Sequence, residues 1–283
     1  MFRFFSVFSL GLVLAVPSLV DAQELTKGSR PGGIGDAVTA TSEGANAIHH
    51  NPAGIARSVM YAIEGTFEYN PSGSVLNASV SDSKTNPSLG AGVSYSYFIG
   101  RDENADLTGH DIRVGIGVPV VPDRVALGVS GRYLKFSDAD VEVLNGFTLD
   151  AGAIIKVTEG LHLGVAGQNL IDPCSLDRCK TVAPTTITGG VGFTADIFTF
   201  SGDVGVDLTS QENAAMLFGL GLEVLLDAVP LRAGFERIDS SDTSNLTFGA
   251  GWRTSAAGFD VGYKLNLQNT GDMVFLGSFS IYL

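Results

Sequence analysis

From residue 59 to the end of the chain, the sequence repeats one pattern, in which apolar side chains alternate with small or polar ones. Phe259 and Val261, for example, alternate with Asp260 and Gly262. A period of two puts alternate side chains on opposite faces of a β-strand. Segments of about ten such residues, separated by turn residues, are typical of the strands of a transmembrane β-barrel.

The pattern divides this part of the chain into fourteen segments. Even strand numbers are the rule in single-chain bacterial barrels. We therefore predict an all-β fold, a 14-stranded antiparallel transmembrane β-barrel over residues 59–283. The predicted strands are 59–70, 73–82, 88–99, 108–119, 123–136, 145–157, 160–169, 185–195, 197–208, 214–226, 229–238, 244–254, 257–267 and 272–282.

The connections between the predicted strands differ in length according to their parity. Those that follow even-numbered strands are short, apart from 83–87, and those that follow odd-numbered strands are longer and more polar. Outer-membrane barrels have short periplasmic turns and longer external loops, so we expect both termini in the periplasm. The short turns include 121–122, 158–159, 196 and 255–256, and the longer loops are 100–107, 137–144, 170–184, 209–213, 239–243 and 268–271.

The first 22 residues have the features of an export signal. Arg3 supplies a positive charge, residues 4–16 are almost wholly apolar, and Val20 and Ala22 are small residues at the expected spacing before a cleavage site. An apolar stretch of this length is typical of a signal peptide and is too short to span a bilayer as a helix. We predict cleavage after Ala22, a mature chain that begins near Gln23, and export to the outer membrane.

Composition and charge argue against several kinds of partner and site. The net charge of −13 disfavours nucleic acid and an anionic membrane surface as partners. The two cysteines, Cys174 and Cys179, lie in a polar loop, where an exported protein is expected to form a disulfide. Two thiols without further ligands nearby predict no metal site. No spacing typical of a catalytic triad is recognisable, so we expect no cofactor and no enzymatic activity.

Residues 23–58 do not alternate and are rich in glycine, alanine and other small residues. Small residues let a backbone pack closely against a wall. Asn51-Pro52 favours a turn, and a short helix could form across 43–48. Because this segment precedes a wide barrel, we predict that it folds into the lumen as a hatch or plug. The chain then has three parts, a signal peptide (1–22), an N-terminal hatch (23–58) and the barrel (59–283).

The end of this segment carries a family resemblance. A Gly-x-x-Ala run that ends in Asn51-Pro52-Ala53-Gly54 resembles the N-terminal signature of the long-chain fatty acid transporter (FadL) superfamily, which includes the PorV-like secretion-associated barrels. The stretch Gln168-Asn169-Leu170 resembles the PorV-like branch. The resemblance implies a 14-stranded barrel with an N-terminal hatch, in which Asn51, Pro52, Ala53 and Gly54 form the hatch turn and take part in gating.

The strand alternation also predicts which charged side chains face the lumen. Their signs are mixed, so we expect either a salt-bridge and water network around the hatch, or a lining that selects ions or substrates. The predicted lumen residues are Arg113, Arg132, Asp150, Asp203, Asp207, Glu223, Arg232, Glu236, Arg253, Asp260 and Lys264.

These observations leave two functions open. The first is passive, hatch-gated transport of small hydrophobic or amphipathic molecules, fatty-acid-like in chemistry, which the hatch and the family resemblance favour. The second is a non-conducting barrel that serves as a membrane anchor or shuttle for a secretion or surface complex, which the short loops and the PorV-like stretch favour. The expected partners are outer-membrane lipids and either a small hydrophobic ligand or a secreted or surface protein.

Overall fold

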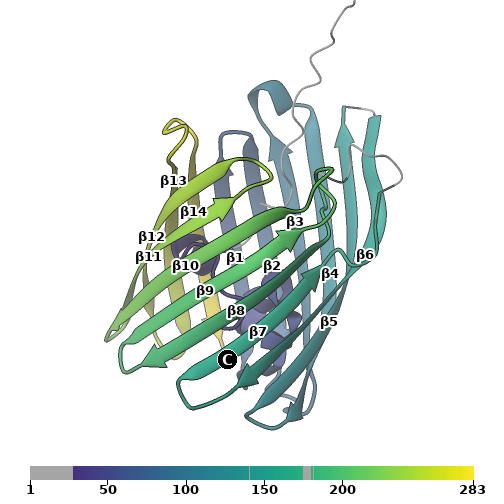
Figure 1. Cartoon of the computed structure of the whole chain (residues 1–283). Coiled ribbons are helices and arrows are strands. Elements are labelled where there is room, and N and C mark those ends of the chain that lie inside the picture. Colours follow the sequence, from purple (N-terminus) through teal and green to yellow (C-terminus); the bar gives the residue numbers. More distant parts are fainter. Residues whose placement is uncertain (1–27, 140, 175–179, 181) are drawn as a thin grey trace, which may run out of the picture.

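The computed structural model describes residues 28–139, 141–174, 180 and 182–283, so the predicted signal peptide, the start of the predicted hatch and Cys179 lie outside the described residues. Within these ranges, fourteen strands pair antiparallel with their neighbours in the chain, and β14 pairs with β1 to close the barrel (Figure 1). The predicted 14-stranded antiparallel β-barrel is confirmed. No helix in the described part of the chain is long and apolar enough to cross a membrane.

The strand boundaries follow the predicted segments closely, because the alternating residues are those that form the ladders. The strands are β1 (Tyr61–Asn70), β2 (Gly73–Asp82), β3 (Gly90–Gly100), β4 (Leu107–Val121), β5 (Val125–Asp138), β6 (Val141–Lys156), β7 (Leu161–Gln168), β8 (Thr186–Ala195), β9 (Phe198–Asp207), β10 (Ala215–Leu226), β11 (Val229–Ile238), β12 (Thr243–Arg253), β13 (Ala257–Asn266) and β14 (Met273–Tyr282).

The largest departure from the predicted segments lies between β5 and β6. The predicted loop 137–144 is wrong, because both strands extend into it. A register shift between Phe136 and Ser137 marks a β-bulge. Val143 and Leu144, although adjacent on β6, are both buried. A bulge adds one residue to a strand and so breaks the period of two, which is why the pattern there does not resemble a strand.

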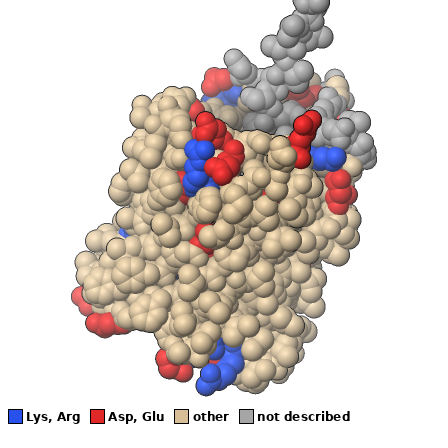
Figure 2. Space-filling view, viewed as in Figure 1, with Lys and Arg blue, Asp and Glu red and all other residues tan. Residues whose placement is uncertain are grey.

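The barrel is apolar outside and polar inside. Val114 and Leu220 on the exterior are 60% and 61% exposed, whereas Asp150 and Thr148 on the lumen side are at most 2% exposed. On the face shown in Figure 2, charged side chains gather near the two ends and the middle is nearly free of them. An exterior of this kind suits lipid rather than water.

The two ends of the barrel differ in their connections. β1 begins and β14 ends at one end, together with the short turns that follow β4, β6, β8, β10 and β12. We call this the terminal end. The connections after β3, β7, β9, β11 and β13 lie at the opposite end, which we call the loop end and which is uppermost in Figure 1. The longest of them runs from Gln168 to Thr186.

Residues 28–58 lie inside the barrel (Figure 1). They form α1 (Ser29–Gly33), the 3₁₀ helix η2 (Gly44–Asn46), α2 (Ala47–His50) and the 3₁₀ helix η3 (Pro52–Ala56); a further 3₁₀ helix, η4 (Asp102–Asn104), lies in the connection after β3. α1 packs against β11 to β14, and η3 packs against β3 to β6. Residues 28–58, which we call the lumen segment, therefore bridge opposite sides of the lumen.

The loop end of the lumen is filled on one side by an apolar cluster. Phe98 and Phe136, which lie near strand ends and resemble interfacial aromatic residues in the sequence, point inward and are at most 3% exposed. Val182 and Ala183, from the connection after β7, pack against them, with Cys174 at the edge. The two phenylalanines are thus part of an internal core because they occupy lumen-facing positions of their strands.

Candidate functional site in the barrel lumen

Asn51 attaches the lumen segment to the wall. Its side chain is fully buried, and Nδ2 donates to the backbone oxygens of Thr39, Ala153 and Val165 at 2.8, 3.2 and 3.3 Å. Its Oδ1 accepts the backbone N–H of Ala53 at 3.2 Å and caps η3. The amide group therefore joins two parts of the segment to β6 and β7. Asn51, the first residue of the predicted hatch turn, is thus attached to the barrel wall.

Glycines in the wall provide the space for this attachment. A Cβ placed on Gly152 would lie 2.0 Å from Oδ1 of Asn51, and a Cβ on Gly128 would lie 2.2 Å from the backbone of Pro52 and Ala53. Gly54 fits against Ser42 in the same way, with 2.5 Å between a Cβ and the carbonyl oxygen. The predicted hatch turn thus lies in direct backbone contact with the wall.

A buried ion-pair cluster lies on β4, β5 and β6. Asp111 accepts from Arg113 at 3.0 Å and from Arg132 at 2.9 Å. Arg113 also approaches Asp150 at 3.4 Å, and Arg132 donates to the side-chain oxygen of Asn169 at 2.8 Å. Two guanidinium groups and two carboxylates balance in charge, as burial of ions requires.

This cluster reaches the lumen segment through His49. Gln168 Nε2 donates to the carbonyl oxygen of His49 at 2.7 Å, and Arg113 approaches the same oxygen at 3.5 Å. The His49 ring contacts the hydroxyl of Ser94 through Nε2 at 2.9 Å. Burial, reinforced by the charge of Arg113, lowers the pKa of His49 well below its usual range. His49 is therefore a neutral side chain at ordinary pH.

A second ion-pair cluster lies on β10, β11 and β13 and includes the lumen segment. Arg232 pairs with Glu223 and Asp260, each at 2.5 Å. Arg30, which is part of α1, pairs with Glu223 at 3.3 Å. Burial alone would lower the pKa of Arg30, but the charges of Glu223 and Glu43 outweigh it and raise that pKa. Arg30 therefore stays charged and attaches α1 to the wall.

Two further contacts hold residues 36–39. Lys264 pairs with Asp36 at 2.6 Å and with Glu236 at 2.8 Å. Asp203 accepts the backbone N–H of Thr39 at 2.9 Å. The first part of the segment is therefore held by charged groups on β9 to β13, whereas residues near Asn51 are held by hydrogen bonds and close packing.

The charged residues predicted for the lumen do not all have the same role. Asp207 accepts the backbone N–H groups of Thr209 and Ser210, each at 3.0 Å, and so shapes the loop after β9. Glu223 and Arg253 are partly buried. The remaining nine, which include Asp207, are all buried: Arg113, Arg132, Asp150, Asp203, Asp207, Arg232, Glu236, Asp260 and Lys264.

Several charged members of the site are not among the lumen residues predicted from the sequence. Asp111 lies two residues before Arg113, on the same face of β4, so the alternation could have identified it. Glu64 on β1 accepts from Asn46 at 2.9 Å and could have been found in the same way. Arg30 and Asp36 belong to the non-alternating segment, where no periodicity indicates which side chain meets the wall.

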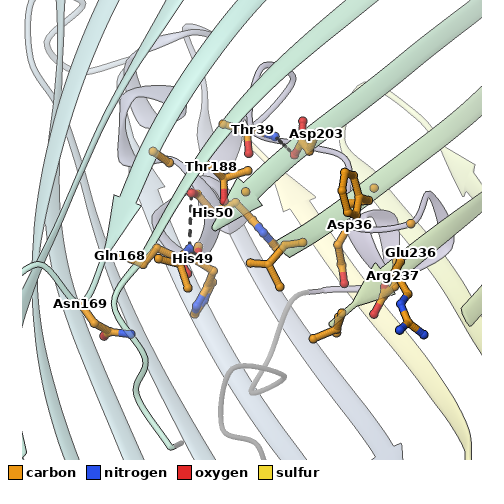
Figure 3. Close-up of a pocket in the computed structure, with 18 of the residues that line it drawn as sticks. Asp36, Thr39, His49, His50, Gln168, Asn169, Thr188, Asp203, Glu236 and Arg237 are labelled. Carbon is orange, nitrogen blue, oxygen red and sulfur yellow. Dashed lines mark hydrogen bonds between the residues drawn. The ribbon is translucent and has the colours of Figure 1, made fainter. Parts of the chain in front are cut away.

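Cavities lie on both sides of the lumen segment. The larger, of about 440 Å³, opens toward the terminal end and is lined by residues that include Glu43, Met60 and Tyr282. The smaller, of about 120 Å³, lies toward the loop end and is lined mainly by polar side chains such as Thr188 (Figure 3). His50 lines both cavities, so α2 lies between them. The described residues include no group of three or more His, Cys, Asp or Glu side chains placed to hold a metal ion.

Comparison with known proteins gives structural neighbours and no sequence relatives. No protein-family model and no curated protein matches the sequence. A Pseudomonas aeruginosa FadL homologue superposes with a TM-score of 0.64 at 12% identity, covering 90% of this chain and 98% of that one. The Pseudomonas putida toluene transporter TodX superposes with a TM-score of 0.62 at 9% identity, covering 91% of this chain and 97% of that one.

The Ralstonia pickettii toluene transporter TbuX gives a TM-score of 0.59 at 12% identity, covering 90% of this chain and 97% of that one. Identities this low establish the fold and not the activity. These superpositions each cover about nine-tenths of the chain. The chain shares its fold with the FadL-type transporters, in agreement with the resemblance of residues 28–56.

Proposed function

We propose that this protein is an outer-membrane barrel that passes small hydrophobic or amphipathic molecules passively across the membrane, with residues 28–58 as the hatch. The observation that carries the proposal is the pair of lumen cavities that meet at His50. A pathway then needs a local displacement of α2 rather than removal of the whole segment.

The chemistry of the larger cavity supports an amphipathic ligand. Its wall combines the apolar side chains of Met60, Ile63 and Tyr282 with the charged groups of Arg30 and Glu43. Cavities that are apolar with a few placed polar groups are the usual form of small-molecule sites. Two structural neighbours are toluene transporters, which makes a small aromatic hydrocarbon the first ligand to test.

The contacts of the hatch suggest which part moves. Residues at Asn51 and η3 are fixed by backbone packing against the wall, so they form the stationary end. α2 is held to β7 by Gln168, which donates to the carbonyl oxygen of His49 at 2.7 Å and lies 3.5 Å from that of His50. Loss of these hydrogen bonds would leave α2 held by the contacts of His49 with Arg113 and Ser94, and would so ease the movement that joins the cavities.

A second function, a sealed barrel that anchors or shuttles a secreted or surface protein, is favoured by one observation. The segment is attached to the wall on both sides of the lumen, by ion pairs at Arg30 and Asp36 and by packing at Asn51. A plug held this firmly suits a barrel whose role is structural.

Uptake into liposomes tests the proposal. The purified barrel is reconstituted and the entry of toluene is compared with that of a small polar dye. We expect toluene uptake above that of empty liposomes, and faster uptake for His50→Ala and Gln168→Ala, with Thr270→Ala in an exposed loop as the control. Deletion of residues 28–56 serves as the fully open reference.

Two results would favour the sealed barrel. One is the failure of the wild type, both point variants and the deletion to admit toluene or any other apolar probe, although each is folded. The other is the copurification of a surface protein in stoichiometric amount with the intact chain.

A further inference from the structure

The apolar runs on the exterior of three neighbouring strands end at the same level. On β4, β5 and β6, the first polar exterior residues toward the loop end are His110, Lys135 and Asn145. His110 is the register partner of Lys135, and Lys135 is the register partner of Asn145. The three side chains therefore form one row across the strands, and Tyr97 of β3 continues it as the partner of His110.

The row lies at the edge of a band that matches a membrane. The exterior positions of β4 from Ile112 to Val120 are apolar. Eight residue steps at about 3.4 Å cover about 27 Å along the strand, and a tilt of about 40° reduces this to about 21 Å. Outer-membrane barrels have apolar bands of about 25 Å. The row thus coincides with the headgroup level at the loop end, which is the external end when both termini are periplasmic.

Lys135 has an unused positive charge at this level. Its side chain is exposed, and no hydrogen bond or ion pair joins it to another side chain in the described part of the chain. Arg237, another cation on an exterior strand position near the loop end, pairs with Asp239 at 2.8 Å and Asp242 at 2.7 Å. Lys135 therefore lacks the compensation that the chain supplies elsewhere.

His110 is oriented by two tyrosines. Its Nδ1 lies 2.9 Å from the hydroxyl of Tyr95, and its ring lies 5.0 Å from that of Tyr97. When Nδ1 accepts the hydroxyl hydrogen, Nε2 carries the ring hydrogen and is available as a donor. The neighbouring Asn145 is already satisfied, because it accepts from Tyr133 and donates to Glu142, each at 2.8 Å. Tyr97 also offers a hydroxyl in this row, but Lys135 supplies its positive charge, and His110 lies beside Lys135 as a nitrogen donor.

We propose that His110 and Lys135 bind a phosphate group of a phosphorylated glycolipid in the outer leaflet. A lysine ammonium group attracts a headgroup phosphate at the membrane surface, and the imidazole N–H adds a directed hydrogen bond. The net charge of −13 disfavours anionic surfaces in general, so binding would depend on this local pair. The inference uses the outer-membrane location of the proposed function but not its transport activity.

Native mass spectrometry of the purified barrel in detergent tests the inference, with lipid A as the probe. We expect the bisphosphorylated form to bind more tightly than the dephosphorylated form. Lys135→Gln should weaken binding of the phosphorylated form about fivefold, the effect of one lysine near an anionic surface. His110→Gln should weaken it as well, and Lys135→Arg should retain it. Lys156→Gln, the same change at the terminal end, should leave it unaltered.

Equal binding of the two lipid forms to the wild type would overturn the inference, and this comparison requires no variant to fold. An equal loss of binding to the bisphosphorylated lipid in Lys135→Gln and Lys156→Gln would also overturn the inference, since that would indicate a general charge effect. Lipid binding is measured without any uptake, so a barrel that admits no toluene could still bind the phosphate, and a transporting barrel could fail to bind it.

Discussion

At the scale of single residues, the lumen segment is attached to the wall through the side chain of Asn51, which needs the space that a glycine leaves opposite it. Asn51 enters the wall where Gly152 has no side chain, and its Nδ2 serves three carbonyl oxygens. The sequence identified Asn51-Pro52 as a turn, but its partners could not be predicted. Ala153 and Val165 contribute only backbone atoms, which are the same in every residue type and so carry no sequence signal.

Gly152→Ala should displace Asn51, because the added methyl group would lie 2.0 Å from its Oδ1. We expect both Gly152→Ala and Asn51→Ala to lower the free energy of unfolding by about 1–3 kcal/mol, the cost of unpaired buried polar groups. The double variant should lose little more unfolding free energy than either single variant, because both changes disrupt the same contact. Denaturant unfolding in micelles measures this. Gly277→Ala is the matched control, because nothing lies within 4 Å of its added Cβ.

His49 makes stability depend on pH. Its pKa in the folded protein lies well below the ordinary value, so below pH ~6.5 the unfolded chain takes up a proton that the folded chain does not. The free energy of unfolding should therefore decrease as the pH is lowered from 7.5 to 5, and it should decrease more in the wild type than in His49→Gln. Unfolding curves at pH 7.5 and 5 measure the difference. An equal pH dependence in the wild type and His49→Gln would contradict the prediction.

At the scale of elements, the strands were predictable and the lumen helices only in part. The short helix considered for 43–48 overlaps η2 and the start of α2, whereas α1 was not expected. A strand repeats one relation between neighbours, so its alternation is visible in the sequence. It failed where the bulge at Phe136 interrupts that relation. α1 and α2 span only five and four residues, too few for a helical period to be recognised. Their positions depend on the wall that surrounds them.

α1 should loosen when its ion pair is removed. In Arg30→Gln, Glu223 keeps Arg232 as a partner at 2.5 Å, so the barrel should remain closed while the lumen segment loses an attachment. We expect faster amide hydrogen exchange in residues 28–41, with little change in the strands. Arg237→Gln, which breaks an ion pair in an exposed loop, is the control. Unchanged exchange in 28–41 would show that packing alone holds α1.

At the scale of the whole molecule, most buried charged side chains face the lumen and the exterior of the barrel is mainly apolar, which is the reverse of a water-soluble protein. Alternation and connection length were enough to predict the number of strands and the closed barrel. Ion-pair partners were not predictable, since they depend on which residues meet across the lumen. Asp111 shows the difference: its face on β4 follows from the sequence, but its contact with both Arg113 and Arg132 requires the register of β4 with β5.

The contact between the first and last parts of the chain has a consequence for assembly. Asp36 pairs with Lys264, 228 residues away, and the barrel closes only when β14 meets β1. The ion pair of Asp36 with Lys264 therefore forms only after β13 is in place. Enclosure of the lumen segment is thus a late event, and contacts this distant in sequence slow folding. A chain that stops before β13 would lack both Lys264 and the seam that retains the segment.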